Sequence, residues 1–483
     1  MQLGGVVGGQ YQILSQKEVQ RIHNASLQIL KRTGIKSRQQ EILQVFSDAD
    51  AEVDFEQGRV RIPPSLVEDA INKAPSKIIL CGRDEKNDLV LEDKKVYFGT
   101  GGAALNVLDL ETGKVRKPLL KDIANIARLV DALDNIHFFI RPVVAQDIPQ
   151  EFLDVNKYYA ALSNTSKHVM GSAYSVKSAL EVIGMAEKIV GGKEALQKRP
   201  IISFITSWMK SPLALDDFTT SILIRIAKER VPVALSSAPM AGSTSPVTLA
   251  GTLAQVNAEQ LSGIVLTQLV SPGAPVLYGA IPSVADMSSM SFLCGAVELG
   301  VLNIAAAQLA HYYDIPFYAW AGLTESKIPD VQAGYEKAVT ALLVGLAGAN
   351  YIHNSAGMLE STTTVAYEQY VIDNEIIGMV MRTLRGIEIN EDTLALEVID
   401  KVGPGGNFLA ESHTVSHMRS EFFFPKLSDR SNREKWLAEG GKDARQRARE
   451  IAINILATHK PLAIPCEVDK EIRSLVKGLR QGA

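Results

Sequence analysis

The sequence predicts an α/β protein built on a (β/α)8 barrel of the TIM type. Two observations predict it. Between residues 96 and 385, a short β-branched or aromatic run followed by a longer amphipathic helix recurs about eight times. Successive runs begin about 30–45 residues apart, which is the length of a βα unit. An α+β extension over residues 1–95 and a helical extension over residues 386–483 are expected to pack on the barrel.

The N-terminal extension begins with a well-marked helix. Ser15 and Glu18 have the spacing of a capping box, and Gly34 is expected to end the helix. The barrel strands are predicted at 96–99, 136–143, 168–172, 201–207, 231–237, 275–281, 315–321 and 351–355.

Helix boundaries in the barrel follow from local signals. Ser211-Pro212 and Ser245-Pro246 are read as helix starts, and Gly191-Gly192 and Gly348 as helix ends. Helices are also predicted at 391–402, 431–459 and 466–478. A doubly wound sheet is the alternative architecture, and it would require a phosphate-binding glycine turn after its first strand.

Composition excludes several classes of function. The chain has 483 residues, 46% hydrophobic and 22% charged, with a net charge of −4, so it offers no basic surface for nucleic acid. Three distant cysteines exclude a disulfide framework and a four-cysteine zinc site. The first ten residues lack a secretory signal and no apolar run is long enough to span a membrane, so we expect a cytoplasmic protein.

Two motifs look like cofactor sites but have ordinary explanations. Residues 99–104 fit the G-x-G-x-x-A pattern, yet the residues that follow alternate like a hairpin, so a tight turn at the barrel mouth is favoured over a dinucleotide site. His413 and His417 would share one helix face, but Thr414 stands where a zincin has glutamate. We interpret them as packing residues and expect no metal.

Aromatic residues gather near the carboxyl ends of the predicted strands. Trp208 and Trp320 end two strands, Tyr278 lies within another, and Tyr174 follows a fourth. Because these ends meet at one mouth of a barrel, the rings are predicted to form a cage for a cationic ligand. Packing beneath the outer helices is the alternative for each ring.

Polar candidates lie at the same predicted rim. Arg141, His353 and Asn354 are candidates to bind a substrate carboxylate, or they could satisfy local backbone. Lys327 could act as an amine nucleophile, or it could be an exposed loop lysine.

Five segments together resemble the trimethylamine methyltransferase family: 245–259, 322–336, 348–360, 402–407 and 427–430. The resemblance covers nearly the whole chain and implies a (β/α)8 barrel that passes a methyl group from an amine to the Co(I) corrinoid of a separate protein. It implies no tightly bound cofactor, and we also expect a homo-oligomer.

Founding members of that family carry pyrrolysine at the barrel mouth, whereas this sequence has only standard residues, with Lys327 the best candidate for the equivalent position. The chain therefore resembles the non-pyrrolysine branch, which demethylates quaternary amines. Glycine betaine is the first substrate expected, and carnitine or proline betaine are alternatives. A quaternary nitrogen is already cationic and leaves as a neutral amine, so it needs positioning in a dry site.

Two other hypotheses remain open. A barrel lyase could form a Schiff base on Lys327, and a non-enzymic subunit could capture a cation without transferring methyl groups.

Overall fold

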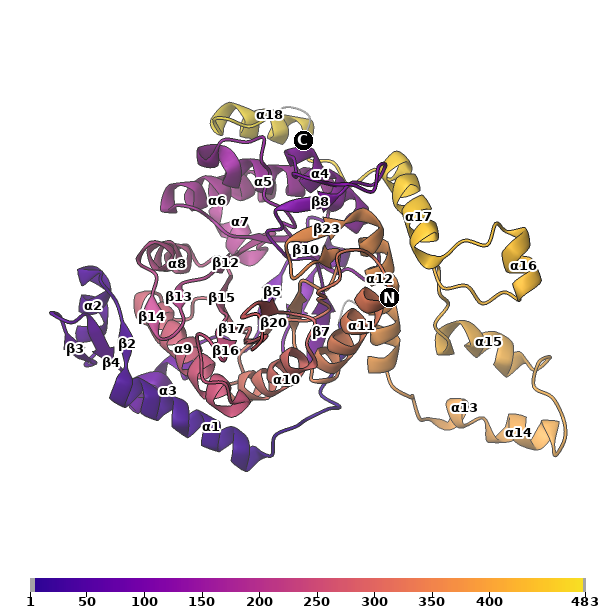
Figure 1. The fold of residues 1–483 in the computed structure, drawn as a ribbon, viewed down its shortest axis with the longest axis horizontal. Coiled ribbons are helices and arrows are strands. Elements are labelled where there is room, and N and C mark those ends of the chain that lie inside the picture. The colour runs from indigo at the N-terminus through magenta and orange to yellow at the C-terminus, as the bar shows by residue number, and fades with distance from the viewer. Residues whose placement is uncertain (1–4, 481–483) are drawn as a thin grey trace.

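The computed structural model describes residues 5–480 and shows a closed barrel of eight parallel strands surrounded by helices (Figure 1). Neighbouring strands pair in the order β7, β10, β11, β12, β15, β17, β20 and β21, and β21 returns to β7. Single bridges close the ring between Gly99 and Phe138 and between Tyr278 and Phe317. The barrel strands are β7 (Lys95–Phe98), β10 (Phe138–Ile140), β11 (His168–Gly171), β12 (Ile202–Thr206), β15 (Val233–Ser237), β17 (Val276–Ala280), β20 (Tyr318–Trp320) and β21 (Tyr351–His353). All eight predicted strands, and the fold class, are confirmed.

Helices follow the strands and form the outer layer. Helix α8 begins where the Asp216 carboxylate accepts the Thr219 N–H, and α6 ends at Gly191, whose positive φ suits a residue without a side chain. Helix α9 is buried along most of its length because it lies between the barrel and the N-terminal extension. The outer helices are α4 (Leu120–Asp131), α5 (Gln150–Asn164), α6 (Val176–Val190), α7 (Lys193–Lys198), α8 (Asp217–Glu229), α9 (Leu249–Val270), α10 (Val297–Tyr312), α11 (Val331–Leu346) and α12 (Tyr367–Leu384).

Two predicted helix starts are wrong. Ser211-Pro212 lies in the turn between two short strands, and α8 begins five residues later, at Asp217. Ser245-Pro246 precedes α9, but Thr248 is its N-cap. In both places the chain first builds loop structure above the barrel, which the local Ser-Pro signal does not reveal. The ends at Gly191 and Gly348 are confirmed.

Short strands lie at the mouth of the barrel, which is the face at the carboxyl ends of the barrel strands. Residues 105–116 form a hairpin, as predicted, in which Val107 pairs with Arg116. The mouth strands are β8 (Asn106–Leu108), β9 (Val115–Arg116), β13 (Met209–Lys210), β14 (Ala214–Leu215), β16 (Met240–Ala241), β18 (Ser283–Ala285), β19 (Phe292–Leu293), β22 (Met358–Leu359) and β23 (Thr364–Ala366).

The N-terminal extension packs mainly on α9. Its sheet is continued by a strand of the barrel's own loop, because Lys36 of β2 pairs with Ala214 of β14. The capping box of Ser15 and Glu18 is present, and Gly34 ends the helical segment. Its elements are β1 (Val6–Val7), α1 (Gln16–Gln28), the π-helix η1 (Ile29–Thr33), β2 (Ile35–Lys36), α2 (Gln40–Ser47), β3 (Glu52–Asp54), β4 (Arg59–Arg61), α3 (Pro64–Lys73), β5 (Ile78–Leu80), the 3-10 turn η2 (Glu85–Asn87) and β6 (Leu89–Leu91).

The C-terminal extension divides into two parts. Helix α17 packs on α12 and α4, and α18 packs on α6. The preceding helices leave the body of the molecule and are exposed along most of their length (Figure 1). The expectation that the whole extension covers the barrel is therefore wrong for this stretch. The helices are α13 (Glu391–Leu394), α14 (Leu396–Val402), α15 (Ser412–Glu421), α16 (Arg433–Ala438), α17 (Ala444–Thr458) and α18 (Cys466–Leu475).

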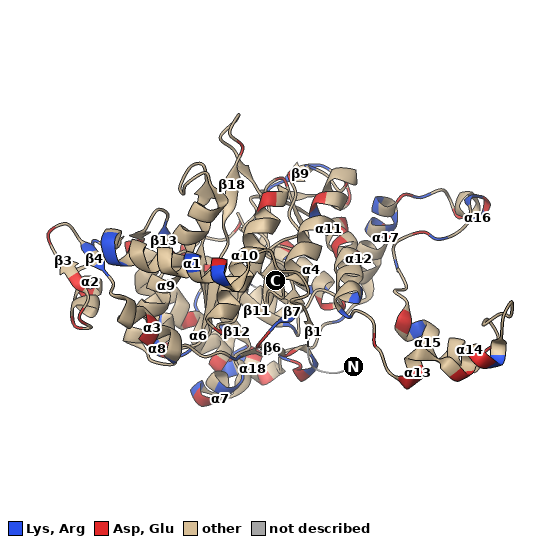
Figure 2. Cartoon of the chain, turned by 90° about the horizontal axis from the view of Figure 1, so that it is seen from below, with Lys and Arg blue, Asp and Glu red and all other residues tan. Residues whose placement is uncertain are grey.

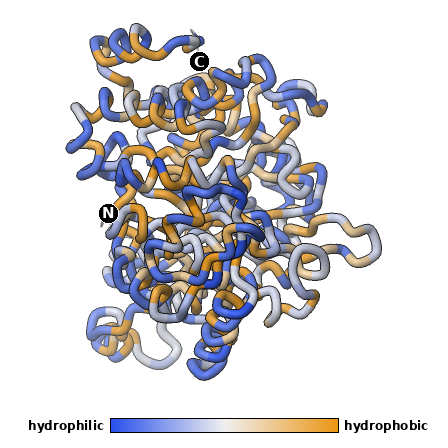
Figure 3. The backbone as a smooth tube through the Cα atoms, turned by 90° about the vertical axis from the view of Figure 1, so that its left-hand side faces the viewer, coloured by the Kyte–Doolittle hydropathy of each residue, from blue (hydrophilic) through white to orange (hydrophobic). Residues whose placement is uncertain are grey.

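Hydrophobic segments run through the middle of the molecule, and hydrophilic loops lie at its edges (Figure 3). One continuous core of buried side chains joins the barrel to both extensions. Within residues 5–480, no helix is both long enough and apolar enough to cross a membrane.

Candidate active site

A cavity of about 320 Å³ opens at the carboxyl ends of β10, β11 and β12. Active sites of parallel barrels are built at this end, and the volume is at the lower limit of ligand pockets, about 300–1,000 Å³. The cavity therefore suits a small ligand. Its lining comprises Gly102, Ala103, Ile140, Arg141, Gly171, Ser172, Ala173, Tyr174, Ile205, Thr206, Ser207, Phe218, Thr219, Ile222, Tyr318 and His353.

One wall of the cavity carries polar atoms without partners. The Nη2 of Arg141 donates to the Ser172 hydroxyl at 2.9 Å, which fixes the guanidinium. Within the described part of the chain, the buried Arg141 Nη1, Thr206 Oγ1 and Tyr318 hydroxyl have no hydrogen-bond partner. Because an unpaired buried polar group costs about 1–3 kcal/mol, three of them around one cavity indicate a ligand that accepts hydrogen bonds there.

A buried ion pair lies behind this wall. The Lys157 ammonium contacts the Asp154 carboxylate and lies 5.1 Å from the ring centre of Tyr174. Asp154 also accepts the Tyr174 N–H at 2.6 Å and the Ser178 hydroxyl at 2.5 Å. Burial, together with the nearby charge of Arg141, lowers the pKa of Lys157 to about 7. When Lys157 is protonated, two cations and one anion give this region a positive potential, which favours a carboxylate.

Uncharged rings also line the cavity. Tyr318 and His353 stack with ring centres 4.1 Å apart and an interplanar angle of 18°. The Nδ1–H of His353 donates to the Ala319 carbonyl at 2.6 Å, and burial lowers the pKa of this histidine to about 3, so it is neutral at physiological pH. Tyr174 and Phe218 add two further rings to the lining. These π-faces suit a cation that carries methyl groups.

The stack continues along the barrel interior. Tyr351 lies below Tyr318, at 5.8 Å, and Phe138 stacks on Tyr351 at 3.5 Å. On the other side of His353, Trp320 lies parallel to it at 6.2 Å. This column of rings fills the barrel and supports the cavity wall.

The structure brings only part of the predicted aromatic cage together. Tyr174 lines the cavity, and Trp320 stands one ring away, with its indole N–H bonded to the Pro282 carbonyl at 3.2 Å. Trp208 is fully buried against α9, where a Cβ on Gly263 would meet its ring at 2.4 Å. Tyr278 is also fully buried, and its hydroxyl donates to Asn257 of α9. Trp208 and Tyr278 therefore pack beneath outer helices, which is the alternative that the sequence left open.

Of the lining residues, sequence reasoning named only Arg141, Tyr174 and His353 as site candidates, and the polar and aromatic residues that it missed include Ser172, Thr206, Phe218 and Tyr318. Tyr318 could have been found, because it lies two residues before Trp320 and so shares its face of the strand. Phe218 lies in the first turn of α8, where nothing in the local pattern marks an aromatic residue as functional.

The polar candidates have different positions. Arg141 and His353 line the cavity. Asn354 is buried beside the glycine turn, with its Oδ1 where a Cβ on Gly101 would lie, and it is not part of the lining. Lys327 is exposed, and its ammonium donates to the Glu325 carbonyl at 2.9 Å, outside the cavity. Lys327 is therefore not part of the lining of this cavity.

The glycine turn is a tight turn at the mouth, as the sequence favoured. A Cβ on Gly102 would lie 1.9 Å from the Met358 side chain and 2.5 Å from the Pro142 carbonyl, and φ there is +137°. Only glycine fits this position. The turn leads into the β8–β9 hairpin, so no helix N-terminus is available for a pyrophosphate.

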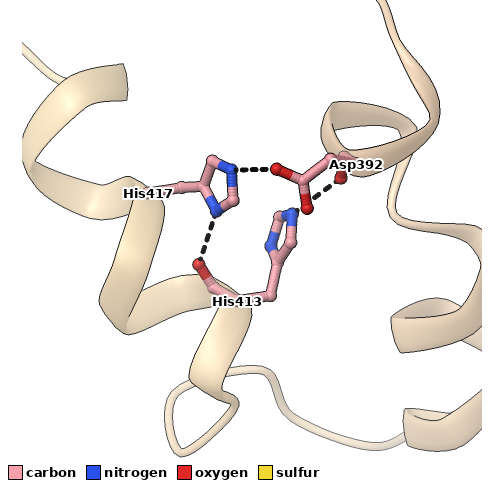
Figure 4. A group of neighbouring side chains, drawn as sticks. All are labelled: Asp392, His413 and His417. Atoms are coloured by element: carbon pink, nitrogen blue, oxygen red, sulfur yellow. Dashed lines mark hydrogen bonds and ion pairs between the residues drawn. The ribbon is translucent and has the colours of Figure 1, made fainter.

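His413 and His417 lie on α15, which extends away from the barrel (Figure 1), and Figure 4 shows the two side chains beside Asp392. Their rings stack 4.2 Å apart, and the Nε2 of His417 lies 2.9 Å from the Asp392 carboxylate on α13. Within residues 5–480, this is the one cluster of histidine, cysteine or acidic side chains whose geometry could hold a metal ion. Here the contact of His417 with Asp392 joins α15 to α13.

Comparison with known proteins decides the family. The family model described as "Trimethylamine methyltransferase (MTTB)" matches residues 6–481. The chain belongs to this methyltransferase family. The trimethylamine methyltransferase MttB of Desulfitobacterium hafniense is 42% identical over 96% of this chain and 93% of its own length. A glycine betaine methyltransferase from another strain of that species is 35% identical over 96% of both chains.

Solved structures agree on the fold of this MTTB-family chain. The hydroxylamine complex of MtmB superimposes with a TM-score of 0.54 over 92% of this chain and 88% of MtmB, at 14% identity. The Methanosarcina barkeri monomethylamine methyltransferase superimposes with a TM-score of 0.50 over 94% of this chain and 95% of its own chain, at 12% identity. At such identities the likeness concerns the barrel and not the substrate.

Proposed function

We propose that this protein takes a methyl group from a quaternary amine that also carries a carboxylate, with glycine betaine as the first candidate, and passes it to the Co(I) corrinoid of a separate protein. The observation that carries the proposal is the pairing, in one small cavity, of a fixed guanidinium with an unused N–H and a wall of neutral rings. Relatives named for trimethylamine and for glycine betaine are compatible with a methylamine or betaine donor. Carnitine and proline betaine fit the same chemical description.

Such a donor makes few chemical demands on the protein. The N–CH3 bond breaks with both electrons remaining on nitrogen, so the leaving group is dimethylglycine with a neutral tertiary amine and an unchanged carboxylate, while Co(I) supplies the electron pair of the new Co–CH3 bond. Neither a general acid nor a general base is required. Neutral His353 and the rings of Tyr174, Phe218 and Tyr318 would hold the ammonium group by cation–π contact and exclude water.

The carboxylate would lie on Arg141. Its Nη1 is unpaired and its Nη2 is oriented by Ser172, so an incoming carboxylate can bind as a fork. Trimethylammonium, the form of trimethylamine at neutral pH, has no acceptor for this N–H and would leave it buried without a partner. Arg141 therefore favours a betaine over trimethylamine as the donor.

The mouth offers a docking surface for the acceptor protein. The β18–β19 hairpin follows β17 and projects from the body at the top of Figure 2. Met287 and Met290 at its tip are exposed, and so is Val247, which approaches the same glycine as Met287. An exposed apolar rim around a site marks a surface that another protein covers, so the corrinoid protein is expected to bind here.

The test mixes the protein with a Co(I)-reduced corrinoid protein and glycine betaine, carnitine, proline betaine, choline or trimethylamine, and follows methyl-Co(III) by absorbance. We expect turnover with at least one carboxylate-bearing quaternary amine and none with choline. Turnover with trimethylamine alone would contradict the proposal. The variant Lys327→Ala should retain full activity. Loss of activity in this variant would support a Schiff-base mechanism instead.

A further inference from the structure

The stretch between α12 and residue 425 is an ordered protrusion without a core of its own. We call residues 387–424 the lobe; it contains α13, α14 and α15 and extends away from the barrel (Figure 1). No residue of these three helices is buried. Large apolar side chains nevertheless occur along it and face water, namely Ile387, Ile389, Leu396, Ile399, Leu409, Val415, Phe422 and Phe424. So many large exposed apolar side chains on one protrusion indicate an interaction site.

The lobe is held firmly at its base. Arg385 donates to the carbonyls of Ser420 and Glu421, where α15 ends. Immediately beyond, the buried carboxylate of Glu375 accepts three consecutive backbone N–H groups, from Lys426 to Ser428. The lobe is therefore presented in a fixed direction, which lowers the entropy cost of binding through it.

A second uncovered apolar surface lies on the barrel. Every exposed side chain on α11 is apolar: Val331 (82% exposed), Tyr335 (56%) and Val339 (43%). They follow one another every four residues and so form one stripe. The two charged residues of the helix are turned away, since Lys337 is buried and Glu336 accepts hydrogen bonds from the loop at Thr324 and Glu325. An outer barrel helix normally has a charged solvent face, so this face is built to be covered.

We propose that the lobe of one copy of this chain packs on the α11 stripe of a second copy. Both surfaces belong to the same chain, so a single chain in water would leave both uncovered. The lobe is also large enough, because a stable interface uses about 20–30 residues from each partner and the lobe spans residues 387–424.

Charge decides which surface the lobe meets. Acidic residues outnumber basic ones by seven to two within residues 387–424, so two lobes would repel each other. The α11 stripe has no exposed charge and imposes no such penalty. The contact joins two different patches, so each copy contributes its lobe to one contact and its α11 stripe to another, and the copies form an assembly of two or more chains.

The test uses light scattering after gel filtration of the full chain. Wild type should be an oligomer. The double variants Leu396→Glu/Leu409→Glu, in the lobe, and Val331→Glu/Tyr335→Glu, on α11, should each be monomers. Phe55→Glu, which places the same charge on an exposed ring of the N-terminal extension, should leave the oligomer unchanged. Circular dichroism melting of each variant reports whether the fold is intact.

Mixing the two double variants gives the sharpest result. Each retains the surface that the other lacks, so an equimolar mixture should form one-to-one dimers and no larger species. A monomeric wild type, an oligomeric lobe variant with a normal melting curve, or no dimer on mixing two folded variants would each overturn the proposal. These readouts are independent of methyl transfer, so the donor proposed above does not affect them.

Discussion

The cavity and the lobe both contain side chains without suitable neighbours, but the side chains are of opposite kinds. Around the cavity, buried polar atoms of Arg141, Thr206 and Tyr318 lack hydrogen-bond partners. On the lobe, apolar side chains such as Ile389 and Leu409 are exposed where polar ones are expected. Each mismatch is costly in the isolated chain, and each is relieved by a different missing partner.

The difference shows how to read the chemistry of that partner. An unpaired N–H beside neutral rings is complementary to a small zwitterion, whereas an apolar protrusion is complementary to another protein surface. The buried ion pair of Lys337 and Asp373 serves as a contrast, because its ammonium is also bonded to the carbonyls of Gly322 and Met358. That group is satisfied, so it positions loops and calls for no ligand.

The largest expected effect is on stability, and it tests whether Trp208 packs in the core or binds the ligand. Trp208→Ala should lower the free energy of unfolding by about 3–5 kcal/mol, because it opens a void between β12 and α9. Urea denaturation measures it. Since Trp208 does not line the cavity, the affinity for glycine betaine should stay within a factor of about two. A tenfold loss of affinity in the folded variant would place Trp208 in the site after all.

Tyr318→Phe should change stability in the opposite direction. Without ligand, removing an unpaired buried hydroxyl should stabilise the protein by about 1 kcal/mol. The same change should weaken donor binding severalfold if the hydroxyl contacts the ligand. Tyr278→Phe is the matched control, because its hydroxyl is bonded to Asn257 and its loss should destabilise the fold. Equal effects of both changes on stability would refute the distinction between a hydroxyl without a partner and one that is hydrogen-bonded within the fold.

The ion pair behind the cavity predicts a pH dependence. Lys157 has a pKa of about 7 in the folded protein, so raising the pH through 7 removes a positive charge near Arg141. Affinity for glycine betaine should fall over this range, while affinity for tetramethylammonium should not. Calorimetric titrations between pH 6 and 8, roughly one unit either side of that pKa, check this.

The stability of the fold should change with pH in the opposite direction to the affinity. The folded pKa of Lys157 is below its ordinary value of 10.5, so the unfolded chain binds more protons between the two values. This group therefore makes stability rise with pH from about 7 upward. The double variant Asp154→Asn/Lys157→Met should abolish both dependences if it folds, and an unchanged pH profile would assign them elsewhere.

The smallest expected effect concerns the lobe. Hydrogen bonding to the His413 carbonyl and to Asp392 raises the pKa of His417. Its stabilising contact is therefore fully present below the ordinary histidine pKa of about 6.5 and is lost as the pH rises through the folded value. Amide hydrogen exchange in α13 and α15 should speed up over that range, after correction for the intrinsic pH dependence. His417→Ala should show no such transition.

Much of the fold could be predicted from the sequence because its signals are local. The eight strands are short apolar runs ending in Gly, Ser or Pro, and each of them is in place. The ring assignments were less successful, because which way Trp208 and Tyr278 point depends on α9, far along the chain. Ser211-Pro212 misled for a similar reason, since β14 pairs with β2 of the N-terminal extension. The exposure of the lobe was not predicted, because a helical sequence pattern does not reveal whether other parts of the chain cover the helix.

Calorimetric binding of glycine betaine and tetramethylammonium to wild type and Arg141→Met tests the central claim most directly. A charge-assisted bond is worth about 1.5–3 kcal/mol, so Arg141→Met should weaken glycine betaine about 10- to 150-fold. Tetramethylammonium, which has no carboxylate, should bind both proteins alike. If the variant bound glycine betaine as tightly as wild type, or lost both ligands equally, Arg141 would not be the carboxylate site and the account of the cavity would be wrong.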